Sequence, residues 1–301
     1  MQQTHQTIKT LQDALPYIKK FYGKIVLIKY GGSAQADEKL KEKFAQDIVL
    51  LSLVGIKPVI VHGGGSQISS LLEKLNIKSE FKDGHRVTSL DSMKIVEMVL
   101  SGDINKNITS LLNFHGAKAI GLSGKDAKCI KATPKDGGDF GYTGTITSID
   151  SKVILNLIAD GYIPVIAPIA YCEEENHPGF NINADNAASK IAISLKAQKI
   201  LFLTDTKGVL SKENKLLSSL SIDEVKKYKK DKTINGGMLP KVDACVDSIK
   251  NGVNKAHIID GRIEHSILLE LFTSEGIGTE VLRQDNPNNG IDMQKLLDEE
   301  L

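Results

Sequence analysis

Five polar side chains stand next to glycine loops or helix starts, where they could act on a phosphoryl group: Lys29, Arg86, Asn181, Asp185 and Lys241. Lys29 directly continues the apolar run 25–28 and enters a glycine-rich loop at 31–32. Glycines at the end of a buried strand let backbone N–H groups approach an anion closely, and a following helix adds the positive end of its dipole. A lysine in that loop supplies the charge that a phosphoryl group requires.

Two further segments have charged or amide side chains at a predicted helix start that helix capping does not explain. Lys241 stands at a predicted helix start after Gly236 and Gly237, and a helix N-terminus disfavours a cation unless an anion is present as well. The segment 181–186 contains four Asn and Asp residues, whereas N-capping uses one. Both segments are therefore candidates for contacts with an anion or a substrate.

Arg86 and His62 each allow two interpretations. Arg86 follows a predicted turn at Asp83-Gly84, so it is either a surface arginine of a hairpin or the bidentate partner of a carboxylate. His62 precedes the glycines at 63–65 and is expected to support the end of its strand, with a catalytic role as the alternative.

Composition and charge narrow the class of protein. The 38 Lys and Arg residues against 37 Asp and Glu give a net charge of +1, which lacks the basic footprint of a nucleic-acid or membrane-surface binder. Three isolated cysteines predict reduced thiols without a CxxC site. Neither a stretch of about 18 apolar residues nor a secretory signal occurs, so a cytoplasmic protein that binds small molecules is expected.

Several common catalytic motifs are missing from the sequence. It contains no GxxxxGK[ST] loop, no GxGxxG after a predicted strand, no HExxH and no GxSxG. The sequence therefore contains no motif that supports P-loop nucleotide binding, nicotinamide chemistry, metal-dependent hydrolysis or serine acyl transfer.

Apolar runs that alternate with amphipathic segments predict an α/β fold with a mostly parallel sheet between helices. Strands are expected near 25–30, 58–62, 117–122, 162–169, 199–205 and 255–260. Helices are expected near 37–54, 66–75, 90–113, 151–160, 184–197, 240–252 and 264–275. Short alternating pieces at 125–149 and the turn at 81–86 indicate antiparallel hairpins.

An amphipathic helical pattern at 7–22 precedes the first core strand. Pro16 is expected to kink this helix or split it. The pattern fits equally well with packing on its own domain and with burial on another subunit.

Six segments in this order make the chain resemble the amino acid kinase family: 29–32, 61–65, 83–88, 181–185, 203–209 and 236–241. The resemblance covers nearly the whole chain. It is to the members that use ATP to phosphorylate the side-chain carboxylate of N-acetyl-L-glutamate, giving N-acetyl-L-glutamyl 5-phosphate in the second step of arginine biosynthesis. It implies a three-layer αβα sandwich whose open, mainly parallel sheet has about eight strands.

The resemblance also implies roles for individual residues. Lys29 and Lys241 would stabilise the transition state, and Asp185 would orient both lysines. The acyl amino acid would be held by Gly64, Gly65, Arg86 and Asn181. ATP with Mg²⁺ would lie against Gly31, Gly32, Asp205, Gly208, Val209, Leu210, Thr233 and Asn235. No protein ligand of the metal is assigned.

The family divides into arginine-insensitive dimers and arginine-inhibited hexamers, which are trimers of dimers, and the helix at 7–22 resembles the hexamer type. Feedback inhibition by L-arginine would involve Tyr17, Lys212, His257, Glu270 and Gly276. The domains implied are an oligomerisation helix at 1–22, an acyl amino acid and dimerisation lobe at 23–195, and an ATP and arginine lobe at 196–301. Whether a signalling protein also binds is left open.

The residue chemistry agrees with a carboxylate kinase. A side-chain carboxylate is ionised at neutral pH, so it needs no general base, and the obstacle is repulsion between two anions. Three alternatives remain: a kinase for another amino acid carboxylate or for carbamate, a catalytically silent module that senses nucleotide or arginine, and, more distantly, a nicotinamide enzyme.

Overall fold

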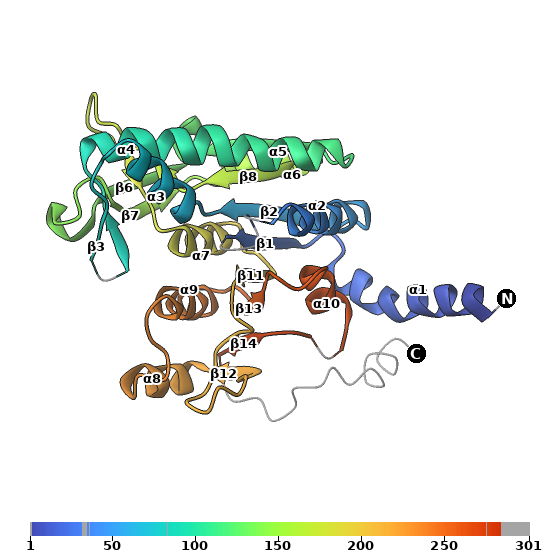
Figure 1. Cartoon of the computed structure of the whole chain (residues 1–301). Helices are drawn as coiled ribbons and strands as arrows, with labels where there is room; N and C mark the ends of the chain where they lie inside the picture. The colour runs from blue at the N-terminus through green and yellow to red at the C-terminus, as the bar shows by residue number, and fades with distance from the viewer. Residues whose placement is uncertain (1, 32–34, 36, 83, 275, 284–301) are drawn as a thin grey trace.

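A central sheet of eight strands organises the molecule (Figure 1). The computed structural model describes residues 2–31, 35, 37–82, 84–274 and 276–283. From one edge to the other the strands are β12 (Ser219–Ser221), β14 (Thr279–Leu282), β13 (Lys255–Asp260), β11 (Lys199–Thr204), β1 (Ile25–Tyr30), β2 (Lys57–His62), β8 (Ile163–Ala167) and β5 (Ala119–Ser123). Neighbouring strands are parallel except for β13 and β14. The mainly parallel α/β sheet that the sequence predicts is confirmed.

Helices cover both faces of this sheet. One face carries α6 (Lys152–Ala159), α7 (Ala184–Ser194), α8 (Ile222–Lys230) and α9 (Met238–Lys250). The other carries α2 (Glu38–Leu53), α3 (Gly65–Lys74), α4 (Leu90–Glu97), the π-helical segment η2 (Met98–Ile104), α5 (Asn105–Phe114) and α10 (Ser266–Phe272). Two apolar clusters result, one on each face, because strand side chains alternate in direction.

The alternation along β1 decides where its polar residues point. Leu27 belongs to the apolar cluster under α7 and α9, whereas Val26, Ile28 and Tyr30 belong to the cluster under α2 and α5. Lys29 is two residues from Leu27 and therefore faces α7 and α9. The central strand thus directs its one lysine toward the two helices that carry the other candidate catalytic residues.

Three antiparallel hairpins stand beside the main sheet. They pair β3 (Glu80–Lys82) with β4 (His85–Val87), β6 (Ile130–Pro134) with β7 (Gly144–Ile149), and β9 (Ile169–Ala170) with β10 (Phe180–Asn181). The first two confirm the hairpins predicted near 81–86 and within 125–149. The third was not predicted, and its second strand ends at a candidate substrate residue, Asn181.

Helix α1 (Gln2–Phe21) is a single helix that runs through Pro16, so the expected division into two pieces does not occur. Its last turns are anchored, because the side chains of Tyr17 and Phe21 are buried. Figure 1 shows the rest of α1 extending away from the sheet. Within the described residues, neither this helix nor any other combines the length and apolar character needed to cross a membrane.

The expected helix at 90–113 is continuous but changes its winding, from α4 through the π-helical η2 to α5. Asn105 opens α5 and is completely buried. Its Nδ2 donates to Val165 O at 2.9 Å and approaches His62 Nε2 at 3.2 Å. A single side chain thus ties the helix to two strands of the sheet.

We expect Asn105→Ala to lower the free energy of unfolding by about 1–3 kcal/mol, because it leaves a buried carbonyl and a buried imidazole nitrogen without a donor. Urea unfolding measures this. Asn107→Ala is the matched control, since Asn107 is exposed and donates only to Asp103 on the same helical stretch; its effect should stay within about 0.5 kcal/mol. Equal effects of the two substitutions would contradict the tie.

Candidate active site

Two lysines from distant parts of the chain meet on one carboxylate. Lys29 Nζ lies 2.9 Å from Asp185 Oδ1, and Lys241 Nζ lies 3.0 Å from Asp185 Oδ2. The side chains are buried, with exposed fractions of 8% for Lys29, 6% for Asp185 and 17% for Lys241. The three predicted catalytic residues are therefore brought together, and two ammonium groups share one negative charge.

Local helix chemistry at the start of α7 frees Asp185 for this role. The N-cap is Asn183, whose Oδ1 accepts from the backbone N–H groups of Asp185 at 2.9 Å and Asn186 at 3.1 Å. Capping is thus completed by one residue of the polar cluster. The carboxylate of Asp185, in the first turn of the helix, is left to face the lysines and also benefits from the positive end of the helix dipole.

The pKa of Asp185 is governed by burial and by the two lysines. Burial alone would raise it, but the charges of Lys29 and Lys241 and their hydrogen bonds outweigh burial and hold the pKa below its ordinary value. Asp185 is therefore ionised at neutral pH. The cluster as a whole carries one net positive charge when both lysines are protonated, which suits an incoming anion.

A cavity of about 210 Å³ opens directly onto this cluster. Its lining includes seven of the predicted residues: Lys29, Gly31, Gly64, Gly65, Arg86, Asn181 and Asp185. Lys29 comes from β1, Gly31 and Gly64 lie in the loops after β1 and β2, and Gly65 begins α3. Arg86, Asn181 and Asp185 come from β4, β10 and α7. The carboxyl ends of parallel strands thus gather the candidate catalytic and substrate-binding residues in one place.

Arg86 is buried, with an exposed fraction of 6%, and its bonded partners are neutral. Its guanidinium donates to Gly65 O at 3.1 Å, to Ser69 Oγ at 2.8 Å and to Ser79 Oγ, and it stacks over Phe81. Within the described part of the chain no carboxylate pairs with it. The surface-hairpin interpretation is therefore wrong, and a cationic group is left to receive a carboxylate from a ligand.

Asn181 is held by a chain of hydroxyl groups that leads back to Arg86. Its Nδ2 donates to Thr88 Oγ1 at 3.2 Å, which lies 2.8 Å from Thr143 Oγ1. The hydroxyl of Thr143 in turn donates to Arg86 O at 2.5 Å. Both threonines are buried, so the two candidate substrate residues have a fixed relation to each other.

His62 supports the strand end, as expected. Burial, together with the charges of Lys106 and Lys29, lowers its pKa to about 4 against the opposing effect of the backbone contact with Gly63, so the ring is neutral. Nδ1 lies 3.0 Å from the Gly63 carbonyl, which can only accept, so Nδ1 carries the proton and Nε2 accepts from Asn105. Both ring nitrogens are thus occupied in holding the second glycine loop.

Gly31 gives the ammonium group of Lys29 its room. A Cβ at this position would lie only 2.7 Å from Lys29 Nζ. Gly32, the other predicted nucleotide contact in this loop, lies outside the described residues. The close approach of backbone to ammonium group explains the type of residue at position 31.

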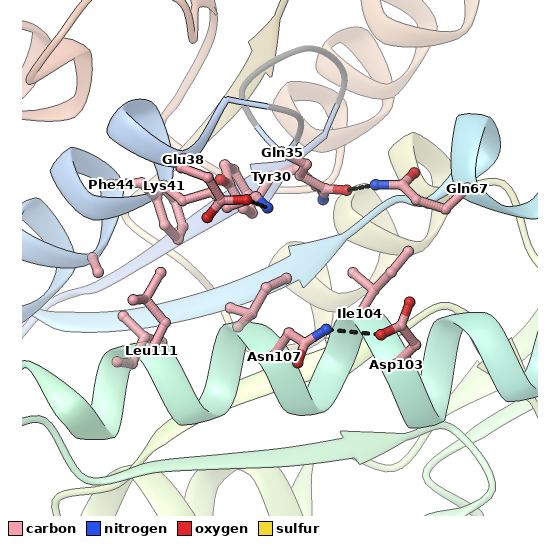
Figure 2. A pocket seen from close by; sticks show the side chains of 13 residues that line it. Tyr30, Gln35, Glu38, Lys41, Phe44, Gln67, Asp103, Ile104, Asn107 and Leu111 are labelled. Carbon is pink, nitrogen blue, oxygen red and sulfur yellow. Dashed lines mark hydrogen bonds and ion pairs between the residues drawn. The ribbon is translucent and has the colours of Figure 1, made fainter.

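Gln35 links the two glycine loops and was missed by the sequence reasoning. Its Nε2 donates to Tyr30 O at 2.9 Å and to Gly63 O at 3.4 Å, and its Oε1 faces Gln67 at 3.5 Å (Figure 2). A single glutamine after a glycine loop does not belong to a recognisable sequence motif. Thr88 and Thr143 were missed for the same reason, since only the fold brings them beside Asn181.

A larger cavity, of about 400 Å³, lies on the opposite face of the sheet. Figure 2 shows aliphatic side chains of η2 and α5, such as Ile104 and Leu111, on one side of it and Tyr30 stacked on Phe44 on the other. Its lysine, Lys41, pairs with Glu38 at 2.7 Å. Lys41 is the one cation among the described residues that line this cavity, so it does not reproduce the meeting of two lysines at Asp185.

Apart from Gly31 and Gly32, the predicted nucleotide contacts fall in two loops. Asp205, Gly208, Val209 and Leu210 follow the carboxyl end of β11, and Thr233 and Asn235 precede α9, the helix of Lys241. Gly208 has φ of 137°, and a Cβ there would lie 2.6 Å from Thr279 Oγ1, so glycine is required. The contacts of these residues are local, for example Val209 N to Thr279 Oγ1 at 2.8 Å, and their role in binding ATP stays a prediction.

Four of the five predicted arginine contacts line a separate cavity of about 270 Å³: Tyr17, His257, Glu270 and Gly276. In it, His257 Nδ1 lies 2.7 Å from Glu270 and Nε2 lies 3.2 Å from Glu280. Lys199 also pairs with Glu270, at 2.6 Å. Lys212 lies elsewhere, 65% exposed and 3.7 Å from Asp231, so the structure does not bring it to this cavity.

The carboxylates of this second cavity titrate unusually low. Burial would raise the pKa of Glu270 and Glu280, but hydrogen bonding and charge from His257, together with Lys199 or Lys255, lower each pKa to about 2. Since the folded-state pKa lies below the unfolded value of about 4.5, each glutamate stabilises the fold above pH 4.5 and loses that contribution as the pH falls toward 2.

We expect Glu270→Gln to destabilise the protein at pH 7 by up to about 3 kcal/mol, and this difference from the parent to shrink below about pH 4.5. Urea unfolding of both proteins between pH 7 and pH 3 checks the trend. Glu213→Gln, at an exposed position, should match the parent throughout. A Glu270→Gln difference that stays constant down to pH 3 would contradict the low pKa.

Comparison with known proteins places the chain among its relatives. A model of the amino acid kinase family matches residues 24–260. An acetylglutamate kinase of Aliarcobacter butzleri is 68% identical over 300 residues, which is 100% of both chains. An acetylglutamate kinase of Wolinella succinogenes is 62% identical over 283 residues, covering 94% of this chain and 100% of that one.

A solved structure shares the fold. N-acetylglutamate synthase from Neisseria gonorrhoeae, in complex with coenzyme A and N-acetyl-glutamate, superposes with a TM-score of 0.81 at 24% identity. The match covers 93% of this chain but 64% of the synthase chain. Because the sequences are only 24% identical, the match shows a shared fold and not a shared activity. Since the family model spans most of the sequence and a close relative matches it from end to end, the chain belongs to the amino acid kinase family and groups with its acetylglutamate kinases.

Proposed function

We propose that this chain transfers the γ-phosphoryl group of ATP to the side-chain carboxylate of N-acetyl-L-glutamate, producing N-acetyl-L-glutamyl 5-phosphate for arginine biosynthesis. The names of its most similar relatives support the substrate. The observation that carries the chemistry is the shared carboxylate, on which Lys29 and Lys241 converge beside the glycine loops.

Binding of the acyl amino acid uses the cavity next to this cluster. The substrate has two carboxylates, of which one reacts and the other needs a cationic partner. Arg86 supplies that partner, because its guanidinium is buried and bonded only to neutral groups in the described chain. Asn181 and the backbone N–H groups of Gly64 and Gly65 complete the contacts.

The reaction brings a carboxylate anion toward an anionic phosphoryl group, so the main barrier is electrostatic. Each lysine has three N–H donors and gives one to Asp185, which leaves two for phosphoryl oxygens. Asp185 fixes both ammonium groups before the substrates arrive, so little reorganisation is needed during transfer. No general base is required, since the attacking carboxylate is already ionised.

ATP is proposed to occupy the loops after β11 and before α9, with Asp205, Gly208, Val209, Leu210, Thr233 and Asn235 as contacts. Mg²⁺ is expected to accompany the nucleotide. Asp185 is the one carboxylate among the described residues that line the cavity beside the lysines, and each of its oxygens already lies next to an ammonium group, so we assign it no role as a metal ligand. The phosphates and water would therefore supply the ligands of the ion.

We expect Lys29→Met and Lys241→Met each to lower kcat by at least about 10²-fold, since each removes a donor aimed at developing charge. Trapping of the acyl phosphate with hydroxylamine measures turnover. Lys190→Met is the control, because Lys190 lies on α7 but pairs with Asp247 away from the cavity. Retention of kcat within tenfold in either active-site variant would remove that lysine from the mechanism.

The same assay separates the remaining functions. Turnover of aspartate, unacetylated glutamate or carbamate, with none of N-acetyl-L-glutamate, would favour a different kinase. Nucleotide binding without any turnover would favour a sensing module. The presence of both lysines and of Asp185 in one ionised cluster favours catalysis over sensing.

Regulation by L-arginine is part of the proposal. The cavity that contains Tyr17, His257, Glu270 and Gly276 is also lined by Glu280. Its two carboxylates are paired with His257 and with lysines, and a cationic ligand would join or replace these partners. Tyr17 belongs to α1, which would link effector binding to the N-terminal helix. We propose the lobes 23–195 and 196–301 for acyl amino acid and for nucleotide with arginine, and a hexamer built as a trimer of dimers through residues 1–22.

The proposed hexamer rests on an apolar stripe of α1. Ile8, Leu11 and Leu15 are 53%, 62% and 49% exposed and follow a helical spacing, so one face of the projecting helix is uncovered in the single chain. A second copy of α1 is the partner that the family resemblance suggests.

Replacing Ile8, Leu11 and Leu15 together by Ser should convert hexamers to dimers and weaken inhibition by arginine. Light scattering coupled to size-exclusion chromatography measures the mass. Lys9→Ala combined with Asp13→Ala, on the polar side of the same helix, should leave both properties unchanged. An unaltered hexamer in the triple variant would refute the role of α1.

A further inference from the structure

A group of metal-binding side chains lies outside the site described above. Cys172, Glu174 and His177 occupy the connection between β9 and β10, and one ligand atom from each lies within 4.8 Å of the other two. A thiol, a carboxylate and an imidazole are the three ligand types that Zn²⁺ uses in proteins. The proposed kinase reaction uses none of them.

The three residues differ in exposure in a way that suits an open metal site. Cys172 is buried, His177 is half-buried and Glu174 is exposed. The ring of His177 is held between Tyr142 at 5.2 Å and Phe180 at 4.5 Å. Two ligands are thus positioned by packing, while the third and a water molecule can approach from solvent.

We propose that Cys172, Glu174 and His177 form a binding site for Zn²⁺, with water as the fourth ligand. A thiolate with an imidazole selects a borderline metal such as Zn²⁺ over Mg²⁺ or Ca²⁺, which require oxygen ligands. With Zn–S near 2.3 Å and Zn–N near 2.1 Å, ligand atoms in a tetrahedral site lie roughly 3.5 Å apart. Because the ligand atoms lie within 4.8 Å of one another, the group must close by up to about 1 Å, to which rotation of the exposed Glu174 side chain can contribute.

The charges around the site agree with a divalent cation. Glu173 is paired with Lys131 at 2.7 Å, and Lys128 lies over the ring of Tyr171. Within the described residues neither Glu174 nor Glu175 forms a salt bridge, so the tip of the connection is acidic. Binding converts the thiol of Cys172 to a thiolate bound to the metal and releases its proton to solvent.

The metal would also alter a hydrogen bond next to the substrate strand. Gly179 N–H donates to His177 Nδ1 at 3.0 Å. Metal at Nδ1 takes this lone pair, and metal at Nε2 moves the ring proton to Nδ1, so the bond is lost in either case. Gly179 directly precedes β10, which ends at Asn181 in the substrate cavity. Zinc should therefore disturb Asn181, a consequence that rests on the proposed function, whereas binding itself does not.

The test uses full-length, tag-free protein that has been reduced and stripped of metal. Titration with Co²⁺ should give a sulfur-to-cobalt charge-transfer band at one equivalent, and Zn²⁺ should displace it. Cys172→Ser should abolish the band, and His177→Gln and Glu174→Gln should each weaken Zn²⁺ binding by at least about tenfold. Glu175→Gln and Cys129→Ser are the matched carboxylate and thiol controls and should bind as the parent does.

Equal Zn²⁺ affinity in parent and His177→Gln protein, or the absence of the cobalt band in the parent, would overturn the site. His177 is half-buried, so its variant keeps the test usable if Cys172→Ser does not fold. In the kinetic arm, saturating Zn²⁺ should raise the KM for N-acetyl-L-glutamate severalfold in the parent but not in His177→Gln. An unchanged KM with zinc bound would overturn the coupling, and a parent without kinase activity would overturn the proposed function while the cobalt band still decides the site.

Discussion

One carboxylate shared by two ammonium groups is the interaction on which the rest of the structure depends. Asp185 is almost completely buried, and a lone charge in that position would be costly. The charges and hydrogen bonds of Lys29 and Lys241 outweigh this cost of burial, because they hold the pKa of Asp185 below its ordinary value. The same pairing leaves an excess positive charge facing the cavity. Stability of the cluster and its affinity for an anion therefore have one physical origin.

The fold brings Lys29, Asp185 and Lys241 together from three separate elements. The alternation of side chains along β1 turns Lys29 toward α7 and α9, Asn183 caps α7 so that Asp185 is free, and the first turn of α9 presents Lys241. None of the three elements is adjacent to another in sequence. A parallel sheet achieves this because its strands all end at one edge, where loops from distant segments meet.

Much of this could be predicted from sequence, because the strands β1, β2, β8, β11 and β13 are rich in consecutive apolar residues. The strands β12 and β14 and the helix α8 were missed, since β12 and β14 are short and α8 is rich in lysine. The division of α1 at Pro16 was wrong because the helix accommodates the proline near its anchored end. Spacing alone could not indicate Gln35, Thr88 or Thr143, whose roles arise from contacts between segments far apart in the chain.

Charge is handled differently in the two polar cavities. The catalytic cavity is lined by Arg86, whose bonded partners are neutral, and lies beside two lysines that share the single charge of Asp185. The cavity beneath α1 instead contains Glu270 and Glu280, which are paired with His257 and with lysines. The central claim is that both lysines next to the catalytic cavity contact the γ-phosphoryl group. A crystal structure with a non-hydrolysable ATP analogue and N-acetyl-L-glutamate tests it most directly. The account predicts that Lys29 Nζ and Lys241 Nζ both lie within about 3 Å of oxygens of the γ-phosphoryl group while remaining paired with Asp185. A complex in which either nitrogen stays beyond hydrogen-bonding distance of that group would contradict it.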